Sequence, residues 1–462
     1  MVHLYEPNGY YIAIDQNSGC VHALDRATYA VLSHFDEDGT FDEAARPALL
    51  SQEALTEAEL DEILDEIEEL RKSGQLFSED LFKPFAQGFK QRQSVLKAMC
   101  LHVAHACNMD CEYCFAGKGE YHGKAGLMSL ETGKKAIDFL VANSPGRTNL
   151  EVDFFGGEPL LNWDVCKELV RYGRSLEEST GKNFRFTLTT NGILVDQDVI
   201  DFCNKEMGNV VLSLDGCRET NDRMRHLKGT ERGGSAYEKI VPKFKAFADA
   251  RGQKDYYMRG TYTQYDLHFA DEILHMADLG FKELSMEPVV APMSAPYALH
   301  EEDAEILCEE YEKLALAMLE RRKEGRPFNF YHYDIDLMGG PCISKRISGC
   351  GVGTEYVAVT PEGDIYPCHQ FVGEERFRLG TLDTGITNPS VHEEFTGCNV
   401  YSHKECEDCF ARLYCSGGCA ANAYHTTGTV TGVYDLGCVL HRKRIECAVM
   451  MKVAEAMEAD SE

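Results

Sequence analysis

The chain has few basic residues for its size. Its 462 residues include 46 lysines and arginines against 76 aspartates and glutamates, which gives a formal net charge of −30. A nucleic-acid-binding protein needs the opposite balance, because Lys and Arg make the contacts to phosphate. We therefore expect no nucleic-acid partner. The acidic excess is explained by solubility, and attraction of a basic peptide is the less favoured alternative.

Long apolar runs are also missing. No segment approaches the roughly 18 apolar residues that cross a bilayer, so we expect no contact with a membrane. The first residues, MVHLYEPNGYYIAID, lack the cationic stretch followed by an apolar one that marks a secretory signal, and this predicts a cytoplasmic protein. No Ser/His/Asp set or pair of carboxylates stands out as acid–base machinery, and we find no internal repeat.

Cysteine, in contrast, is abundant, with 19 residues. In a cytoplasmic protein this favours metal or redox chemistry over a disulfide framework. Cys107, Cys111 and Cys114 lie within eight residues, in the run AHACNMDCEYCF. A cubic four-iron cluster takes one ligand on each iron, usually a Cys thiolate, so three thiolates leave one iron open to a small molecule. Three buried free thiols are the less favoured alternative.

The first piece of the chain is a small module over residues 1–85. Short strand-like runs are separated by Asn-Gly and Asn-Ser-Gly turns, and helices follow, the clearest over 56–73. Thr56 and Glu59 predict a capping box at its start. Few strands with helices are typical of a winged-helix-like fold, and an exposed strand edge would suit capture of an extended peptide. Residues 86–95 are polar and are interpreted as a linker.

Strands alternate with helices over residues 96–300. The candidate strands cover 96–103, 150–155, 184–190, 210–214, 256–261 and 283–287, and the candidate helices cover 130–143, 163–179, 197–205, 237–251 and 271–279. Six β/α repeats predict an α/β fold with a parallel, partly barrel-like sheet, whose site lies at the carboxyl ends of the strands. Residues 301–338 are expected to form a helical connector. Residues 339–451 are rich in Cys and Gly and poor in long periodic segments, and metal clusters can hold such a region together where a hydrophobic core is too small.

Small polar motifs follow the second, third and fourth candidate strands. They are Gly156-Gly157-Glu158-Pro159, Thr189-Thr190-Asn191-Gly192 and Ser213-Leu214-Asp215-Gly216. Two glycines let a ligand approach the backbone closely, a carboxylate accepts from an ammonium group, and the other polar groups suit ribose hydroxyls and a carboxylate. Each motif alone is a weak signal, and the first could be an ordinary turn. Their order along the chain is specific.

With the cysteine run, these motifs make residues 97–288 resemble the radical S-adenosylmethionine (SAM) enzymes. The resemblance implies that Cys107, Cys111 and Cys114 hold a [4Fe–4S] cluster, that SAM binds its fourth iron, and that cleavage of SAM yields a 5′-deoxyadenosyl radical. It implies SAM contacts from Tyr113, Phe115, Gly156, Gly157, Glu158, Pro159, Thr190, Asn191, Ser213, Asp215 and Arg225. Core packing is the alternative for the two aromatic residues, and a surface salt bridge is the alternative for Arg225.

The C-terminal piece resembles the SPASM domain. It contains Cys350-x12-Gly363-x4-Cys368, then Cys406-x2-Cys409-x5-Cys415-x3-Cys419, then Cys438. The resemblance assigns auxiliary cluster I to Cys350, Cys368 and Cys419, with Cys342 either its fourth ligand or replaced there by an open iron. It assigns auxiliary cluster II to Cys406, Cys409, Cys415 and Cys438. Zinc is the alternative for these thiols. We expect the eight other cysteines to be buried as small hydrophobes.

Nearly the whole chain resembles SPASM enzymes that modify ribosomally made peptides, most closely the maturases of six-cysteine (SCIFF) peptides, on stretches such as CFARLYCSGGCAANAY. The implied fold is a partial (β/α)6 radical SAM barrel with an N-terminal winged-helix-like peptide-recognition module and a C-terminal SPASM domain. The implied cofactors are three [4Fe–4S] clusters and SAM.

The resemblance also implies a reaction. The maturases form thioether bonds, as in sactipeptides and ranthipeptides, here between a Cys sulfur and a Thr carbon of a Cys-rich precursor with a leader. A flavodoxin- or ferredoxin-type protein would supply electrons. C–C cross-linking, epimerisation and formylglycine formation are the alternatives. Sulfatase-maturing relatives carry an Asp where this chain has His369, which counts against formylglycine formation; a structural hydrogen-bonding role is the other interpretation of His369.

Overall fold

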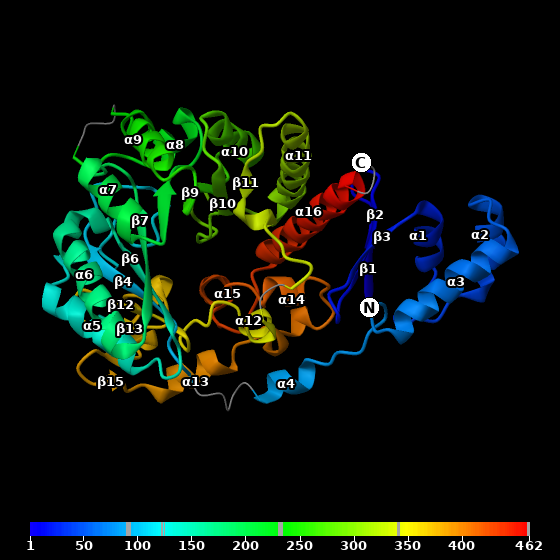
Figure 1. The fold of residues 1–462 in the computed structure, drawn as a ribbon, viewed down its shortest axis with the longest axis horizontal. Helices are drawn as coiled ribbons and strands as arrows, with labels where there is room; N and C mark the ends of the chain where they lie inside the picture. Colours follow the sequence, from blue (N-terminus) through cyan, green and yellow to red (C-terminus); the bar gives the residue numbers. More distant parts are fainter. Residues whose placement is uncertain (89–93, 122, 124, 230–233, 340–341, 460–462) are drawn as a thin grey trace.

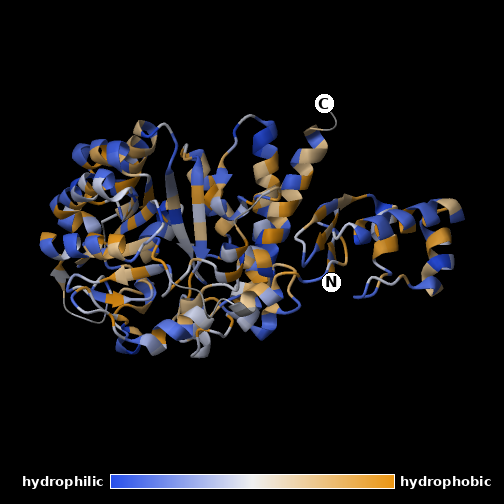
Figure 2. Cartoon of the chain, turned by 60° about the horizontal axis from the view of Figure 1, so that its bottom comes forward, coloured by the Kyte–Doolittle hydropathy of each residue, from blue (hydrophilic) through white to orange (hydrophobic). Residues whose placement is uncertain are grey.

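The computed structural model describes residues 1–88, 94–121, 123, 125–229, 234–339 and 342–459. Residues 89–93 of the expected linker lie outside this description. A large α/β body and a small N-terminal module stand at opposite ends of the molecule, and the last helix runs between them (Figure 1). Along the helices of both parts, hydrophilic and hydrophobic residues alternate (Figure 2), as expected for helices with one face on a core.

The N-terminal module begins with a three-stranded antiparallel sheet and continues with helices. The strands pair in the order β1 (Val2–Tyr5), β2 (Tyr11–Asp15), β3 (Val21–Leu24), and the helices are α1 (Arg26–Leu32), α2 (Arg46–Gln52), α3 (Glu57–Lys72) and α4 (Lys83–Gln87). The expected capping box is confirmed, since Glu59 N donates to Thr56 Oγ1 at 3.3 Å and Thr56 N donates to Glu59 Oε2 at 2.8 Å.

The central strand of this sheet joins two hydrophobic cores. Ala13 packs in the core formed with the helices of the module, whereas Ile12 and Ile14 belong to the core of the body. Successive side chains of a strand point to opposite faces, so one face of the sheet is covered by the module's own helices and the other by the rest of the chain.

Six parallel strands form the centre of the body, which confirms the expected alternation. They are β4 (Ala98–His105), β6 (Asn149–Gly156), β7 (Asn183–Thr190), β8 (Asn209–Ser213), β9 (Tyr256–Tyr262) and β10 (Glu283–Pro288), hydrogen-bonded in this order. The helices between them are α5 (Leu130–Ala142), α6 (Trp163–Thr180), α7 (Gln197–Glu206), α8 (Arg218–Met224), α9 (Ala236–Ala250) and α10 (Phe269–Asp278). The short α8 was not predicted, because it spans too few residues to show a helical period.

The sheet continues at both edges. On the side of β10, β11 (Asn329–Phe330) adds a short parallel strand, and on the side of β4, β12 (Tyr356–Val359) adds another. Three antiparallel strands follow: β13 (Asp364–Tyr366), β14 (Gly380–Thr381) and β15 (Gly385–Ile386). A further short strand, β5 (Gly126–Leu127), pairs antiparallel with β4. The first strands of the Cys-rich piece are therefore part of the main sheet.

The remaining elements are helical. They are α11 (Ala304–Lys323), which lies in the expected connector, α12 (Ile343–Ser348), α13 (Pro389–Gly397), α14 (Arg412–Cys415), α15 (Ala420–Thr427) and α16 (Asp435–Ala459). The long α16 was not predicted, and it runs past residue 451, where we placed the end of the piece. It contacts α11 on one side and the N-terminal strands on the other, so apolar residues lie all around it and no single apolar stripe marks it in the sequence. In the part of the chain described, no helix combines the length and apolar character needed to cross a membrane.

Candidate functional site

The loop that follows β4 carries the three closely spaced cysteines. Cys107, Cys111 and Cys114 are all partly buried. The charge of Cys114 acts on Cys107, and the charges of both act on Cys111. Burial is the main cause that raises the pKa of Cys107 to about 11 and that of Cys111 to about 12. The structure thus brings these three thiols together at the carboxyl end of the first barrel strand, where the sequence predicted a site.

The two glycines at the end of β6 allow the cysteine loop to approach. A Cβ on Gly156 would lie 2.2 Å from the carbonyl oxygen of Ala104, and one on Gly157 would lie 2.2 Å from that of Ala106. In their absence, Gly157 N donates to Ala104 O at 2.8 Å and Glu158 N donates to Ala106 O at 2.9 Å. Ala106 directly precedes the first cysteine. The two glycines therefore admit main chain on this side, and the predicted approach of a ligand to them stays a prediction.

The carboxylate of Glu158 is 1% exposed and binds the motif at the end of β7. It accepts hydrogen bonds from Thr190 Oγ1 and Asn191 N, both at 2.8 Å, and from Leu160 N at 3.1 Å, in the turn that Pro159 begins. Burial raises its pKa to about 7. The predicted role of Glu158 as an acceptor from an ammonium group stays a prediction; what the contacts support is positioning of the neighbouring motif.

Asn191 links that motif to the cysteine loop. Its Nδ2 donates to Asn108 Oδ1 at 2.8 Å and lies 3.7 Å from Cys107 Sγ. The Nδ2 of Asn108 is buried without a hydrogen-bond partner in the structure. A buried donor of this kind beside a thiol is unusual, because leaving it unpaired costs free energy.

Asp215 and Arg225 form a buried ion pair beside the same loop. Asp215 is 1% and Arg225 8% exposed, and the guanidinium contacts both carboxylate oxygens at 2.9 Å. Tyr113 Oη donates to Asp215 Oδ2 at 2.6 Å. The charge of Arg225 acts on Cys111, so this group adjoins the thiols. The salt bridge that we considered for Arg225 exists, but it is buried. Ser213, which ends β8, is partly buried.

Aromatic rings connect the cysteine loop to the interior of the barrel. Phe115 is 47% exposed, and its ring centroid lies 5.6 Å from that of His369, which lies 5.1 Å from that of Phe155. Tyr356 Oη lies 3.4 Å from His369 Nδ1, in accord with the hydrogen-bonding role considered for this histidine. Burial lowers the pKa of His369 to about 4.

His369 and Phe155 line a cavity of about 840 Å³ inside the barrel. Its other walls come mainly from inward-facing positions of the barrel strands and β12, among them Cys100, Asp153, Thr187, Thr189, Arg259, Ser285, Glu287 and Tyr356. The cavity therefore extends along the barrel strands and reaches His369, which follows Cys368.

The charged groups of this cavity were not singled out from the sequence. Burial raises the pKa of Asp153 to about 7. The pKa of Glu287 is lowered to about 2, because His332 at 3.4 Å and Arg444 at 3.3 Å outweigh its burial. The sequence signal that could have identified Asp153 is the alternation of polar and apolar residues over 150–155. This alternation places Asp153 on the face of the strand opposite to the core.

A second cavity lies in the C-terminal piece. Its volume is about 150 Å³, and Cys406, Cys409, Cys415 and Cys438 all line it. Burial raises the pKa of Cys406 to about 12 and that of Cys438 to about 11. The charges of the other three thiols add to the effect on Cys406, and those of Cys415 and Cys409 add to the effect on Cys438. These are the four cysteines that the resemblance assigns to one cluster.

Cys350, Cys368 and Cys419 also come together. Apart from burial, the charges of Cys419 and Cys350 raise the pKa of Cys368. Cys342 is exposed at the start of α12, and the interactions found for these three thiols in the described residues do not include it. They include Cys398, whose pKa is raised by burial and by Cys350.

The cysteines expected to be buried divide into two sets. Four of them are buried: Cys100, Cys166, Cys203 and Cys447. The expectation was wrong for Cys20, Cys217, Cys308 and Cys398, which are only partly buried, because they lie at a turn, at helix ends or on helix faces rather than in the centre of the core. Within the described ranges, no three His, Cys, Asp or Glu side chains converge on one point as the ligands of a single metal ion do.

Comparisons with known proteins agree with this architecture. Residues 101–277 match the family model described as "Radical SAM superfamily". The cysteine-type anaerobic sulfatase-maturating enzyme of Clostridium novyi is 25% identical over 339 residues, 68% of this chain and 85% of that protein. The radical SAM cyclopropyl synthase TigE of Paramaledivibacter caminithermalis is 21% identical over 378 residues, 76% of this chain and 74% of that protein.

Two solved structures share the fold. "Native anSMEcpe with bound AdoMet" superposes with a TM-score of 0.63 at 20% identity, covering 78% of this chain and 99% of the other. "Crystal structure of Streptococcus suis SuiB bound to precursor peptide SuiA" gives a TM-score of 0.53 at 15% identity, covering 95% of this chain and 98% of the other. The expected mixed α/β fold is thereby confirmed, and the second likeness extends over the N-terminal and C-terminal pieces.

Proposed function

Because residues 101–277 match the radical SAM superfamily, we propose that the chain is a radical SAM peptide maturase. Its specific reaction is formation of thioether bonds between a Cys sulfur and a Thr carbon in a ribosomally made six-cysteine precursor with a leader. The superfamily implies a [4Fe–4S] cluster and SAM. The similar proteins named above include maturating enzymes and one structure bound to its precursor peptide.

One observation carries the proposal: a ring contact at the edge of the barrel cavity connects a residue next to one group of thiols with a residue next to another. Phe115 directly follows Cys114, and its ring contacts that of His369, which directly follows Cys368. His369 itself lines the cavity. A peptide side chain that reached His369 and Phe155 in this cavity would therefore lie close to residues that adjoin both groups of thiols, as a reaction that joins hydrogen abstraction to sulfur chemistry requires.

The residues present fit the cofactors that the superfamily implies. Cys107, Cys111 and Cys114 are three thiols of one loop, the ligand set of a cubic cluster with an open iron. The unpaired Nδ2 of Asn108 would find an acceptor in a sulfur atom at this loop, and such hydrogen bonds tune iron–sulfur clusters. The four-cysteine cavity supplies a complete thiolate set for a second cluster, and Cys350, Cys368 and Cys419 supply a third.

The N-terminal module is proposed to recognise the leader. Strand β3 is an outer strand of its sheet, and an extended peptide binds such an edge by adding a strand. The protein would act in the cytoplasm, where a flavodoxin- or ferredoxin-type partner supplies electrons.

The test uses the full chain, reconstituted anaerobically with iron and sulfide and mixed with SAM, dithionite and a six-cysteine peptide. A thioether removes two hydrogen atoms from the peptide and one alkylatable thiol. A C–C cross-link removes two hydrogens and leaves the thiol count unchanged, and epimerisation leaves the mass unchanged. Deoxyadenosine formation without a change in the peptide would overturn the thioether assignment alone. Absence of deoxyadenosine would overturn the radical assignment too.

A further inference from the structure

The four-cysteine cavity is framed by the first residues of the chain. The ring of His3 stacks on that of Phe410 with centroids 3.7 Å apart, and Tyr414 Oη donates to Gly19 O at 2.8 Å. Phe410 and Tyr414 each stand next to one of the four cysteines in sequence. The first strand and the turn between β2 and β3 therefore contact the cysteine-bearing segment just before α14 and within it.

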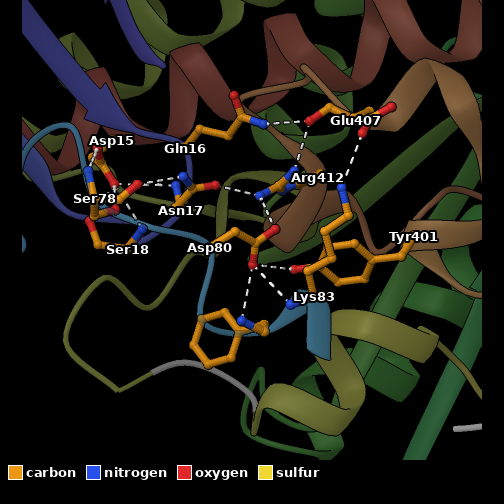
Figure 3. A network of polar contacts seen from close by, with 11 residues as sticks. Asp15, Gln16, Asn17, Ser18, Ser78, Asp80, Lys83, Tyr401, Glu407 and Arg412 are labelled. Atoms are coloured by element: carbon orange, nitrogen blue, oxygen red, sulfur yellow. Dashed lines mark hydrogen bonds and ion pairs between the residues drawn. The ribbon is translucent and has the colours of Figure 1, made fainter. Parts of the chain in front are cut away.

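The centre of this contact is Arg412, which is 5% exposed (Figure 3). Its Nη2 contacts Asp80 Oδ2 at 2.7 Å and also donates to Asn17 Oδ1, while Nη1 donates to Glu407 O at 2.7 Å. Tyr401 Oη donates to the other oxygen of Asp80 at 2.9 Å, and its ring lies 5.4 Å from the guanidinium carbon. One side chain thus binds the tip of the first sheet, the segment before α4 and the cysteine loop.

Asp80 extends the contact to a third element. Its Oδ1 accepts from Phe82 N and Lys83 N, both at 3.0 Å, at the beginning of α4. In that helix Ala86 is buried in one apolar cluster with Cys406. The Asp80–Arg412 pair therefore fixes both the loop that carries the cysteines and the helix that covers one of them.

We propose that Arg412 is a positioning residue through which the four-cysteine site depends on docking of residues 1–86. The inference rests on the proposed function, which assigns a cluster to these thiols. The N-terminal module is then a structural part of that site as well as a peptide-binding element. Coupling between two sites is reciprocal, so iron at the four thiols must in turn stabilise the docked module.

The same interface contains a matched control. Lys83 Nζ lies 3.1 Å from Glu407 Oε1, and both side chains are more than half exposed. An exposed pair contributes little, whereas removal of one partner from a buried pair leaves the other charge without compensation. Arg412→Gln and Lys83→Gln each delete one cation from this interface, and only the first is expected to matter.

The experiment compares the two variants with the wild-type full chain after anaerobic reconstitution. The readouts are iron per chain, the EPR spectrum after reduction, and hydrogen exchange of peptides covering residues 1–24 and 404–415. For Arg412→Gln we expect loss of one cluster's iron and exchange in both segments faster by about tenfold or more, since a buried charge loses its partner. The SAM-dependent EPR change should persist in both variants, because the contacts of Arg412 are with Asn17, Asp80, Tyr401 and Glu407 and not with the loop after β4.

A second variant tests whether loss of iron at the four thiols weakens docking of the N-terminal module. Cys438→Ala removes one of the four thiols from α16, and reciprocity predicts faster exchange in residues 1–24 although the Arg412 contacts are untouched. Exchange and iron content of Arg412→Gln equal to those of Lys83→Gln, or unchanged exchange in Cys438→Ala, would overturn the inference. Wild-type protein with no more iron than the Cys107 loop holds would instead overturn the cluster assignment on which it rests.

Discussion

Replacement of Gly157 by alanine tests how the cysteine loop is held. The new Cβ would lie 2.2 Å from the carbonyl oxygen of Ala106 and 2.6 Å from its carbon. Because C···O contacts are normally about 3.3–3.6 Å, the loop has to move by roughly 1 Å. The hydrogen bond from Glu158 N to Ala106 O, at 2.9 Å, would be broken.

The cost has two parts. Loss of one backbone hydrogen bond costs about 1 kcal/mol net, and overpacking of a tight contact costs about 1–3 kcal/mol. For a domain of this size the sum corresponds to a fall of the thermal midpoint on the order of 10 °C. Because Ala106 adjoins Cys107, we also expect loss of the iron held by the first thiol set and of the SAM-dependent EPR change.

The assay is thermal unfolding of the apoprotein together with iron analysis after reconstitution. Gly88→Ala is the control, since Gly88 has a negative φ and a Cβ added there would meet no atom within 4 Å. If Gly157→Ala retains the thermal midpoint and the iron of Gly88→Ala, the close approach of the two backbones does not hold the loop, and the reasoning is refuted.

Three further predictions concern stability. Asp215→Asn leaves the buried guanidinium of Arg225 without its partner, so unfolding should become easier by about 3–5 kcal/mol, and a wild-type midpoint in denaturant would contradict this. Burial raises the pKa of Asp153 from 3.8 to about 7, so the folded state binds this proton more tightly than the unfolded state. The associated stability is fully present below about pH 4 and is lost as the pH rises through about 7. Asp153→Asn should remove this part of the slope between about pH 4 and 7, and an unchanged slope would argue against a buried titrating carboxyl. Thr56→Ala removes the capping box of α3 and should cost about 1 kcal/mol, measured as faster hydrogen exchange in α3 with Thr56→Ser as control; equal exchange in the two variants would contradict it.

The barrel could be predicted from the sequence because its strands and helices carry strong local patterns. The expected strand over 184–190 and β7 (Asn183–Thr190) differ by one residue at one end. In this strand buried and inward-facing residues alternate, and turn residues mark its limits. Helix α16 lacked such a pattern, since it is buried between α11 and the N-terminal strands and presents apolar residues in all directions.

The candidate site, like the fold, could be predicted from the sequence only in part. Cysteine spacing is a local signal for the loop after β4, whereas the division of the C-terminal cysteines into two groups came from the resemblance. The structure brings Cys406, Cys409, Cys415 and Cys438 around one cavity and brings Cys368 near Cys350 and Cys419, and their roles as cluster ligands stay a prediction. The contact partners of the site residues, in contrast, could not be predicted from the sequence. The sequence offered Arg225 to a ligand, but its guanidinium is bound by Asp215, because two residues ten positions apart meet only once α8 folds back onto the end of β8.

The role of Arg412 could not be predicted from the local sequence. Within CFARLYC it is one polar residue between cysteines, and no spacing rule gives it a partner. Its partner, Asp80, is 332 residues away, near the end of the segment that the sequence analysis assigned to the N-terminal module. A buried guanidinium requires compensating acceptors, so its burial fixes the relative position of two pieces that composition alone treats as independent. If the exchange and iron measurements on Arg412→Gln give the expected result, the boundary between the N-terminal module and the Cys-rich piece is one of sequence and not of structure.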